Sequence, residues 1–196
     1  VGSSIDLDQF RSLPESEKKH DLVFLGRLHE LKGVFDLPEV WAQVKTARPA
    51  ATLKVVGEGP HRTAVMDRFA ARNLMDGVEF TGGIGEEDKN RLLAEARLGL
   101  SLSSEEGWGL AVNEYLASEL PVVAYDLPVF QEVFPDVLHS VSLGDKTAAS
   151  RAILQLLADP AAREAMGRQG RELAQRYDYR AMAREELRHL EALGKS

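Results

Sequence analysis

The sequence predicts an α/β domain built on a doubly wound parallel sheet, because short apolar runs alternate along it with longer amphipathic stretches. Each apolar run has the length of a buried strand and is bounded by glycine, proline or polar residues. Each intervening stretch has the periodicity of a helix with one apolar face. Repeated alternation of this kind is typical of a Rossmann-like sheet, which binds its ligands beyond the carboxyl ends of the strands.

The predicted strands are nearly continuous apolar runs, as expected for a parallel sheet that is covered on both faces. They are expected at 22–25, 53–56, 78–80, 98–102 and 122–124, with one more near Val141. Between and after them, helices are expected at 34–46, 61–72, 86–96, 110–118, 146–158, 161–176 and 180–193. Asp159 and Pro160 separate the helices expected at 146–158 and 161–176.

Length and composition agree with one compact domain spanning residues 1–196. The chain is 44% hydrophobic, which is enough to bury a substantial core. Its net charge of -7 argues against a nucleic-acid surface and against a broadly basic membrane-binding face. The sequence contains no cysteine, which excludes disulfides and thiolate metal sites. It shows neither a secretory leader nor a membrane-spanning apolar run, so a soluble, cytoplasmic chain is expected.

The most informative motif is the stretch 103–114, which places Glu106 and Glu114 eight residues apart across a glycine-containing turn. Gly107 and Gly109 allow a ligand to approach the backbone closely, and the amides at the start of the next helix, at Leu110, suit a pyrophosphate. At roughly 1.5 Å per residue, Glu114 lies about 7 Å along that helix from Gly109, whereas Glu106 stays in the loop. The motif therefore predicts a site for a phosphorylated sugar, with one carboxylate on each side of the diphosphate.

Further motifs occur at 26–28, 32–33, 53–60, 78–82 and 120–124, and one more is found near the start of the chain, at 5–10. Together with the paired glutamates, they resemble the retaining glycosyltransferases of family 4, which have the two-domain GT-B fold. The order and approximate spacing of the motifs match those of the family. The resemblance covers nearly the whole chain.

The resemblance assigns catalytic roles to Glu106, Arg27 and Lys32. Arg27 and Lys32 would grip the donor phosphates and, with the helix start at Gly109, stabilise charge on the departing diphosphate. The alternative interpretation is that both are solvated surface charges, as most lysines and arginines are. Glu106 would contact the sugar and Glu114 the ribose. No cofactor and no obligatory metal are expected, because these groups take over the task that a metal performs elsewhere.

The same resemblance assigns further donor contacts. They involve Gly26, Gly57, Gly82 and Ile84, followed by Gly107, Trp108, Gly109 and Leu110. Gly57 also has a structural interpretation that needs no donor contact, because a glycine turn followed by proline suits the start of a helix. Trp108 has one too, because its ring could pack against the sheet. The histidines are too scattered to suggest metal ligands.

The family has two domains of similar size, and every matched motif belongs to the second. The resemblance therefore implies the C-terminal donor-binding half of a longer enzyme, without its N-terminal acceptor domain. The expected partner is a nucleotide-diphosphate sugar, UDP- or GDP-linked, and any contact with a membrane would be made by the missing domain. Two alternatives stay open: a non-catalytic nucleotide-binding module and half of a sugar-nucleotide epimerase of the same fold. One departure is Glu119, which stands where the family has a glycine, so that a left-handed helix cap there would be costly.

Overall fold

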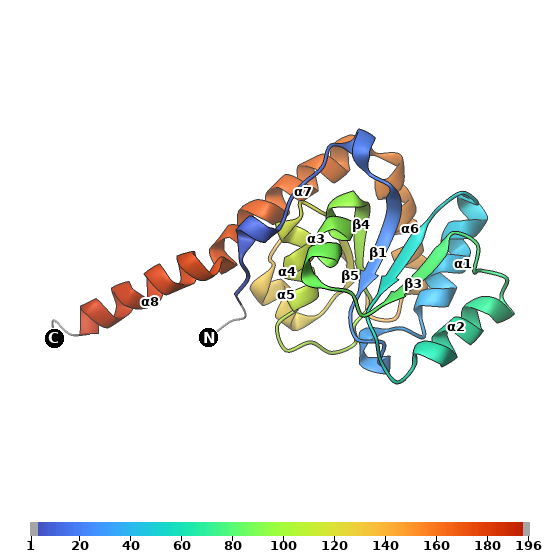
Figure 1. Cartoon of the computed structure of the whole chain (residues 1–196), viewed down its shortest axis with the longest axis horizontal. Coiled ribbons are helices and arrows are strands. Elements are labelled where there is room, and N and C mark those ends of the chain that lie inside the picture. The colour runs from blue at the N-terminus through green and yellow to red at the C-terminus, as the bar shows by residue number, and fades with distance from the viewer. Residues whose placement is uncertain (1–3, 194–196) are drawn as a thin grey trace.

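The computed structural model describes residues 4–193, apart from the side chains of residues 185 and 189–193. Its centre is a six-stranded parallel sheet with the strand order β3-β2-β1-β4-β5-β6 (Figure 1). The strands are β1 (His20–Leu25), β2 (Leu53–Val56), β3 (Val78–Gly82), β4 (Ala96–Ser101), β5 (Val122–Tyr125) and β6 (His139–Val141). The predicted doubly wound parallel fold is confirmed.

Helices cover both faces of this sheet. One face packs against α1 (Leu37–Ala47), α2 (Arg62–Ala71) and α6 (Lys146–Ala158). The other face packs against α3 (Glu86–Glu95), α4 (Leu110–Ala117), α5 (Pro128–Val133) and α7 (Pro160–Ala174). The last helix, α8 (Tyr179–Leu193), extends away from this body (Figure 1). Short 3₁₀ turns are found at η1 (Leu7–Gln9), η2 (Glu15–Glu17), η3 (Glu30–Lys32) and η4 (Gln175–Tyr177).

Most predicted elements are found within a few residues of their expected bounds. The first helix begins later than predicted, at Leu37, because η3 and Gly33 in a left-handed conformation (φ 67°) turn the chain before it. Ala96 opens β4 instead of ending the helix before it. The short helix α5 was not predicted, since its six residues are too few to show a helical period.

Each strand contributes to two apolar cores, because successive side chains point to opposite faces of the sheet. In β1, Leu22 and Phe24 belong to the core beneath α1, α2 and α6, and Val23 belongs to the core beneath α4, α5 and α7. All three are almost completely buried. This double burial explains the uninterrupted apolar runs that made the strands legible in the sequence.

The strand order reverses between β1 and β4, which lie side by side at the centre of the sheet. From β1 the chain proceeds outward to β2 and β3, and then crosses to the other side of β1 for β4, β5 and β6. Such a reversal opens a crevice beyond the carboxyl ends of the two strands, where doubly wound folds bind ligands. The loops that follow Leu25 and Ser101 lead into this crevice.

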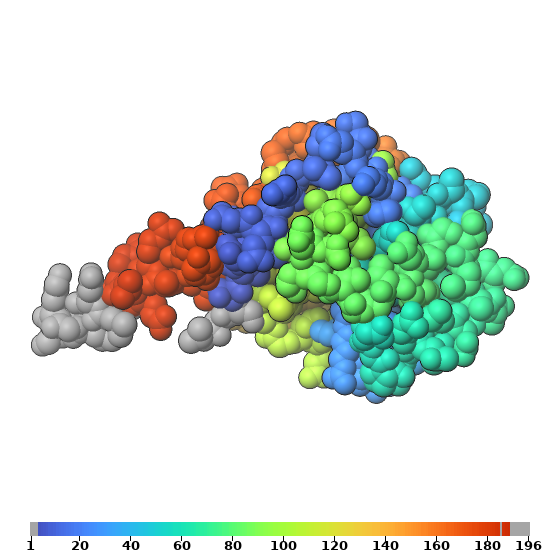
Figure 2. Space-filling view, in the orientation of Figure 1, coloured from blue at the N-terminus to red at the C-terminus, as the bar shows by residue number. Residues whose placement is uncertain are grey.

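The N-terminal segment runs over the surface along α7, from the η4–α8 junction to the amino end of β1 (Figures 1 and 2). It is tied to the η4–α8 junction by hydrogen bonds from Ile5 N to Tyr177 O (3.0 Å) and from Tyr179 N to Ile5 O (2.9 Å). Of the helices in residues 4–193, none combines the length and the hydropathy that crossing a bilayer would require.

Glu119, the second residue after α4, adopts the left-handed conformation that the sequence analysis described as costly for a residue other than glycine. Glu119 has φ 55°, and its amide donates to Leu116 O at 3.0 Å while the Leu120 amide donates to Tyr115 O at 2.9 Å. This conformation suits glycine and costs an L-residue free energy. Glu119 therefore keeps the backbone of a glycine cap without its conformational freedom.

Candidate functional site

The loops that follow β1 and β4 are joined directly by their backbones. The Ser104 amide donates to Leu31 O at 2.9 Å. A Cβ on Gly33 would lie only 1.9 Å from Leu102 O, so no other residue can occupy that position without moving the backbone. The contact brings the lysine before Gly33 next to the loop that carries the first glutamate of the motif.

Lys32 and Glu106 form an ion pair across these two loops. The distance from Lys32 Nζ to Glu106 Oε1 is 2.5 Å, and Ser103 Oγ donates to the same oxygen at 2.8 Å. The side chain of Glu106 is 12% exposed and that of Lys32 is 31% exposed. Two of the three predicted catalytic residues are therefore at one place, but they are partners of each other.

A small cavity of about 90 Å³ lies beside this pair, at the carboxyl ends of β1 and β4. Leu110 and Ala111, the first two residues of α4, form one wall. The first amides of a helix have no partner within it and carry the positive end of its dipole. An anion in the cavity would therefore meet both these amides and a lysine. The lining also includes Gly26, Lys32, Ser101, Ser103 and Glu106.

Two packing contacts hold the start of α4 in position. Gly109 has φ 99°, and a Cβ on it would lie within 3 Å of the rings of Phe130 and Phe134. The hydroxyl of Tyr115 accepts from Leu25 N at 2.6 Å, and its ring lies against Gly99 of β4. Helix α4 is thus anchored to both strands at the switch point. Of the residues of α4, Leu110 and Ala111 line the cavity, and Glu114 lies outside its lining.

Glu114, on α4, forms a second ion pair that the motif did not predict. Its Oε1 lies 2.6 Å from Lys89 Nζ of α3, and both side chains are 11% exposed. Lys89 also contacts Glu86 Oε2 at 2.6 Å. Burial raises the pKa of Glu114, while Lys89 acts against that rise. Burial alone would lower the pKa of Lys89, but its hydrogen bonds to Glu114 and Glu86 raise it.

Lys89 is the residue that the sequence reasoning missed. It stands in the predicted helix directly after Glu86, Glu87 and Asp88. A lysine in such acidic company is typical of exposed charge pairs within one helix. Only its burial against α4 distinguishes it, and the sequence pattern does not encode that contact.

Glu106 and Glu114 share one property. Each uses Oε1 for the contacts described above, and its Oε2 has no hydrogen-bond partner among residues 4–193. An ionised carboxylate accepts at both oxygens. Each glutamate therefore has a second oxygen available for a ligand hydroxyl.

Arg27 is the second residue after β1, and its side chain is exposed. Within the described part of the chain it forms no ion pair, unlike Lys32. It lies at the carboxyl end of β1, as the motif predicted, and is available to an anion there. Its phosphate contact stays a prediction.

The glycines at the ends of the first three strands touch one another. Gly57 has φ 130°, and a Cβ there would lie 2.1 Å from Gly26 O. Its amide donates to Gly82 O at 2.9 Å. This close approach of backbones gives Gly57 a structural reason, which differs from the expected one of a turn before a proline at a helix start, since α2 begins only at Arg62. Donor contacts of Gly26, Gly57 and Gly82 stay predictions.

Trp108 packs in an aromatic cluster behind the loop. Its ring centroid lies 5.4 Å from that of Phe134 and 5.0 Å from that of Tyr177, both edge to face. Packing therefore accounts for this tryptophan, and its donor contact stays a prediction. Gly107 has open space around its Cα, whereas Ile84 packs partly against the core beneath α4.

A larger cavity, of about 580 Å³, lies between the N-terminal segment and α3. Its lining contains none of the predicted site residues, and we place the candidate site at the strand ends, where the motifs meet. Among residues 4–193 no group of three or more His, Cys, Asp or Glu is arranged to hold a metal ion. The expectation that no metal and no cofactor are required stays a prediction.

The chain belongs to the glycosyl transferases group 1 family, whose model matches residues 6–173. This confirms the family that the motifs resemble. Over 190 residues the chain is 29% identical to a phosphatidyl-myo-inositol mannosyltransferase from Propionibacterium freudenreichii subsp. shermanii, an alignment that covers 91% of the chain and 46% of that protein. The chain spans about half the length of the curated relatives that it matches.

Solved structures share the fold. HepE from Anabaena, in complex with UDP and glucose, superposes with a TM-score of 0.84 at 18% identity, covering 96% of this chain and 55% of HepE. The C-terminal domain of a glycosyl transferase group 1 protein from Francisella tularensis superposes with a TM-score of 0.79 at 19% identity, covering 89% of this chain and 99% of that domain. At these identities the likeness concerns the fold alone.

Proposed function

We propose that residues 1–196 are the donor-binding, C-terminal half of a retaining glycosyltransferase that uses a nucleotide-diphosphate sugar, UDP- or GDP-linked. The observation that carries the proposal is the arrangement at the switch point. There the start of α4 and Lys32 line one cavity, with a glutamate that has a free oxygen in the loop before α4 and another along the helix. Amides and cations suit the diphosphate, and carboxylates suit the hydroxyls on either side of it.

In this proposal the diphosphate replaces Glu106 as the partner of Lys32. The α4 amides, Lys32 and Arg27 would bind the phosphate oxygens, and the released Glu106 would turn to hydroxyls of the sugar. Glu114 would accept from the ribose hydroxyls. The free cavity of about 90 Å³ is smaller than a nucleotide sugar, which agrees with a pair that must open when the donor binds.

The chemical step transfers the sugar from phosphate to acceptor. The bond between the anomeric carbon and the phosphate oxygen breaks, and its electron pair leaves with the diphosphate. The acceptor oxygen forms the new bond on the same face and gives its proton to the leaving phosphate. Lys32, Arg27 and the α4 amides would stabilise the negative charge that develops on the diphosphate.

Two comparisons support the proposal. HepE, which shares the fold, is described as a complex with UDP and glucose. The Francisella tularensis domain, which is covered almost completely, is described as the C-terminal domain of its parent protein. An acceptor-binding N-terminal domain would supply the facing surface and would be the second partner.

Calorimetric titration with uridine, guanosine and adenosine diphosphate sugars tests donor binding. We expect saturable binding with a preference for one base. Glu114→Ala should weaken it roughly tenfold or more, the least that a hydrogen bond to a charged acceptor contributes. Glu87→Ala removes an exposed glutamate from α3 and serves as the control. Absence of binding, or equal affinity of folded Glu114→Ala, would contradict the assignment.

A second experiment tests the half-enzyme assignment. Orientation of the acceptor lowers a barrier by roughly 7–11 kcal/mol, so a chain without the acceptor domain should transfer sugar several orders of magnitude more slowly than an intact enzyme. The chain would be incubated with a donor that it binds and with lipid, saccharide and polyol acceptors, and products would be followed by mass spectrometry. Multiple-turnover glycosylation by these 196 residues alone would overturn the assignment.

A further inference from the structure

Lys89 is unusual because lysine is rarely buried unless it is paired. The residue is 8% exposed, and its ammonium group donates to Glu114 Oε1 and to Glu86 Oε2, both at 2.6 Å. The two glutamates differ sharply in their surroundings. The side chain of Glu86 is 72% exposed and that of Glu114 is 11% exposed. Water can solvate the carboxylate of Glu86, whereas the buried carboxylate of Glu114 depends on Lys89 for the stabilisation of its charge.

The charged groups that act on Glu114 are Lys89 and Glu86, both from α3. The neighbouring hydroxyl of Tyr115 is engaged with the backbone of β1 and β4 and is not a partner of Glu114. Burial favours the neutral form of Glu114, and Glu86 acts in the same direction. In the described part of the chain, Lys89 is the one group acting on Glu114 that favours its ionised form.

The geometry leaves Glu114 with one bonded and one free oxygen. Lys89 holds Oε1, and Oε2 has no hydrogen-bond partner among residues 4–193. The carboxylate is therefore fixed in rotation and keeps one free acceptor oxygen. Lys89 is therefore placed as expected for a residue that orients a ligand-binding side chain without itself contacting the ligand.

We propose that Lys89 is the positioning residue of Glu114, holding its carboxylate charged and oriented for the ribose hydroxyls of the donor. The inference rests on the proposed function, because ribose is the partner assigned there to Glu114. A merely structural Lys89 would act differently. It would link α3 to α4, and its loss would weaken all ligands at every pH.

The test isolates the ribose contact from the phosphates. Affinities are measured by calorimetry, from mildly acidic to mildly alkaline pH, for the nucleoside diphosphate that binds best and for its 2′,3′-dideoxy analogue. We call the ratio of the two dissociation constants the ribose increment. Protonation of the phosphates affects both constants alike and therefore cancels in this ratio. The wild-type increment should be roughly tenfold or more at neutral pH.

The lysine variants carry the main expectation. In Lys89→Met the increment should fall several-fold at neutral pH and recover as the pH rises and Glu114 ionises. Lys89→Arg, which keeps the charge, should restore most of the increment. Lys19→Met is the matched control, since Lys19 pairs with Glu95 at the other end of α3 and is far more exposed. It should leave the increment unchanged.

Glu86→Gln tests the same inference without disturbing a buried residue. It removes a nearby negative charge and leaves Lys89 to Glu114 alone. The acidic pH at which the increment is half lost should therefore move to a lower value than in the wild type. This readout remains if Lys89→Met does not fold.

The outcomes separate the two claims. An unchanged increment in folded Lys89→Met, an equal loss at every pH, or an unmoved midpoint in Glu86→Gln would overturn the role of Lys89 alone. A wild-type chain that binds both analogues equally would instead refute the ribose assignment of Glu114, and Lys89 would lose its proposed role with it. Failure to bind any nucleotide would refute the proposed function itself.

Discussion

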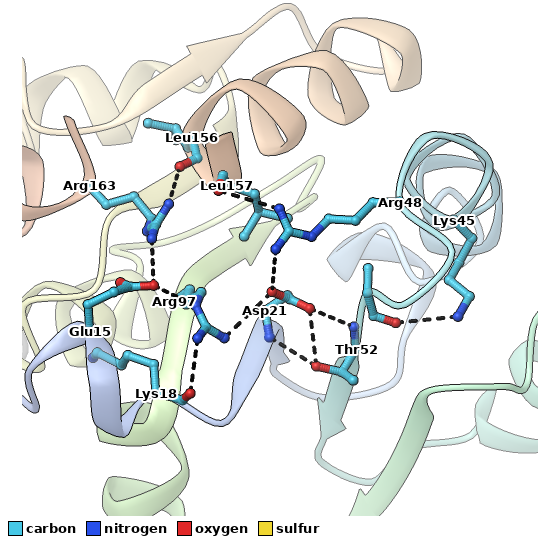
Figure 3. Close-up of polar contacts among 11 residues, drawn as sticks. Glu15, Lys18, Asp21, Lys45, Arg48, Thr52, Arg97, Leu156, Leu157 and Arg163 are labelled. Carbon is cyan, nitrogen blue, oxygen red and sulfur yellow. Dashed lines mark hydrogen bonds and ion pairs between the residues drawn. The ribbon is translucent and has the colours of Figure 1, made fainter. Parts of the chain in front are cut away.

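The two edges of the sheet carry the same kinds of charged residue in different arrangements. At the carboxyl edge, Glu106 and Glu114 each bond to one lysine and keep an oxygen free. At the amino edge, two acids take part in a shared network of several cations (Figure 3). There Glu15 contacts Arg97 and Arg163, both at 2.6 Å.

The amino-edge network connects segments that are distant in sequence. Asp21 at the start of β1 accepts from Thr52 N at 3.0 Å and lies 3.6 Å from Arg97 and 3.7 Å from Arg48 (Figure 3). Arg163 also donates to Leu156 O at 2.6 Å and is 4% exposed. Charges with several partners from different elements hold those elements together, whereas the ion pair of Lys32, beside a cavity, can be exchanged for a ligand. An ion pair that can be exchanged therefore distinguishes the carboxyl edge from the amino edge.

The largest effect is expected at the amino edge. Arg163→Met removes a buried cation from Glu15 and from the Leu156 carbonyl, and losing one partner of a buried pair costs several kcal/mol. Because Glu15 is partly exposed, we expect a loss of about 3 kcal/mol in the free energy of unfolding, measured with denaturant. Nucleotide affinity of the folded variant should stay unchanged. A selective loss of affinity would erase the distinction between the edges.

The second effect is a pH dependence of stability from the same region. Burial lowers the pKa of Lys18 to about 8. The unfolded state then binds more protons than the folded state between about pH 8 and 10.5, so stability should rise with pH in that window. We expect a gain of about 2 kcal/mol from pH 7 to 9.5 from this residue. Lys18→Met should remove the gain. An identical slope in the variant would show that other groups cause it.

The third effect belongs to the carboxyl edge. Lys32→Ala and Arg27→Ala should each weaken nucleoside diphosphate binding roughly tenfold, because charge-assisted contacts with phosphate are lost. Binding of the nucleoside should hardly change. The free energy of unfolding should hardly change in Arg27→Ala and should fall by up to about 1 kcal/mol in Lys32→Ala, which loses its pair with Glu106. Lys19→Ala, at an exposed lysine, is the control. Equal losses for both ligands would indicate a folding defect.

A smaller effect is expected at Glu106, placed at the sugar end. Glu106→Ala should abolish any preference for the sugar nucleotide over the plain nucleoside diphosphate, and Glu106→Gln should do so partly. Because Lys32 is then released from its pair, affinity for the plain diphosphate should rise by up to about fivefold, the value of a partly exposed ion pair. Calorimetric titration with both ligands measures the preference and the affinity. Weaker binding of the plain diphosphate would contradict the exchange of partners.

The smallest effect concerns the cap of α4. Glu119→Gly should relieve the left-handed strain and stabilise the fold by up to about 1 kcal/mol, since only a weak contact of 3.7 Å with Arg171 is lost. Thermal unfolding with and without nucleotide would measure it. The shift should be the same in both conditions. A change in affinity would mean that the cap influences the site.

Local pattern in the sequence was sufficient for much of this molecule. Apolar runs identified the strands because a sheet covered on both faces needs them, and Glu106 and Glu114 were correctly placed in a loop and on a helix. The resemblance identified the family, and the replacement of the family's glycine by Glu119 marked a position where a left-handed conformation would be costly. These features depend on neighbours along the chain, which a pattern can represent.

Only the tertiary structure decided the partners of the two glutamates. Lys32 meets Glu106 across 74 residues and Lys89 meets Glu114 across 25 residues, contacts that arise from where strands and helices are placed. The same holds for Gly57, confined by the backbone of Gly26, and for Trp108 in its aromatic cluster. Sequence pattern determines which residues form strands, loops and helices, since that depends on local period and backbone preference. Which charges pair depends on distances between elements, and these are fixed only when the sheet assembles.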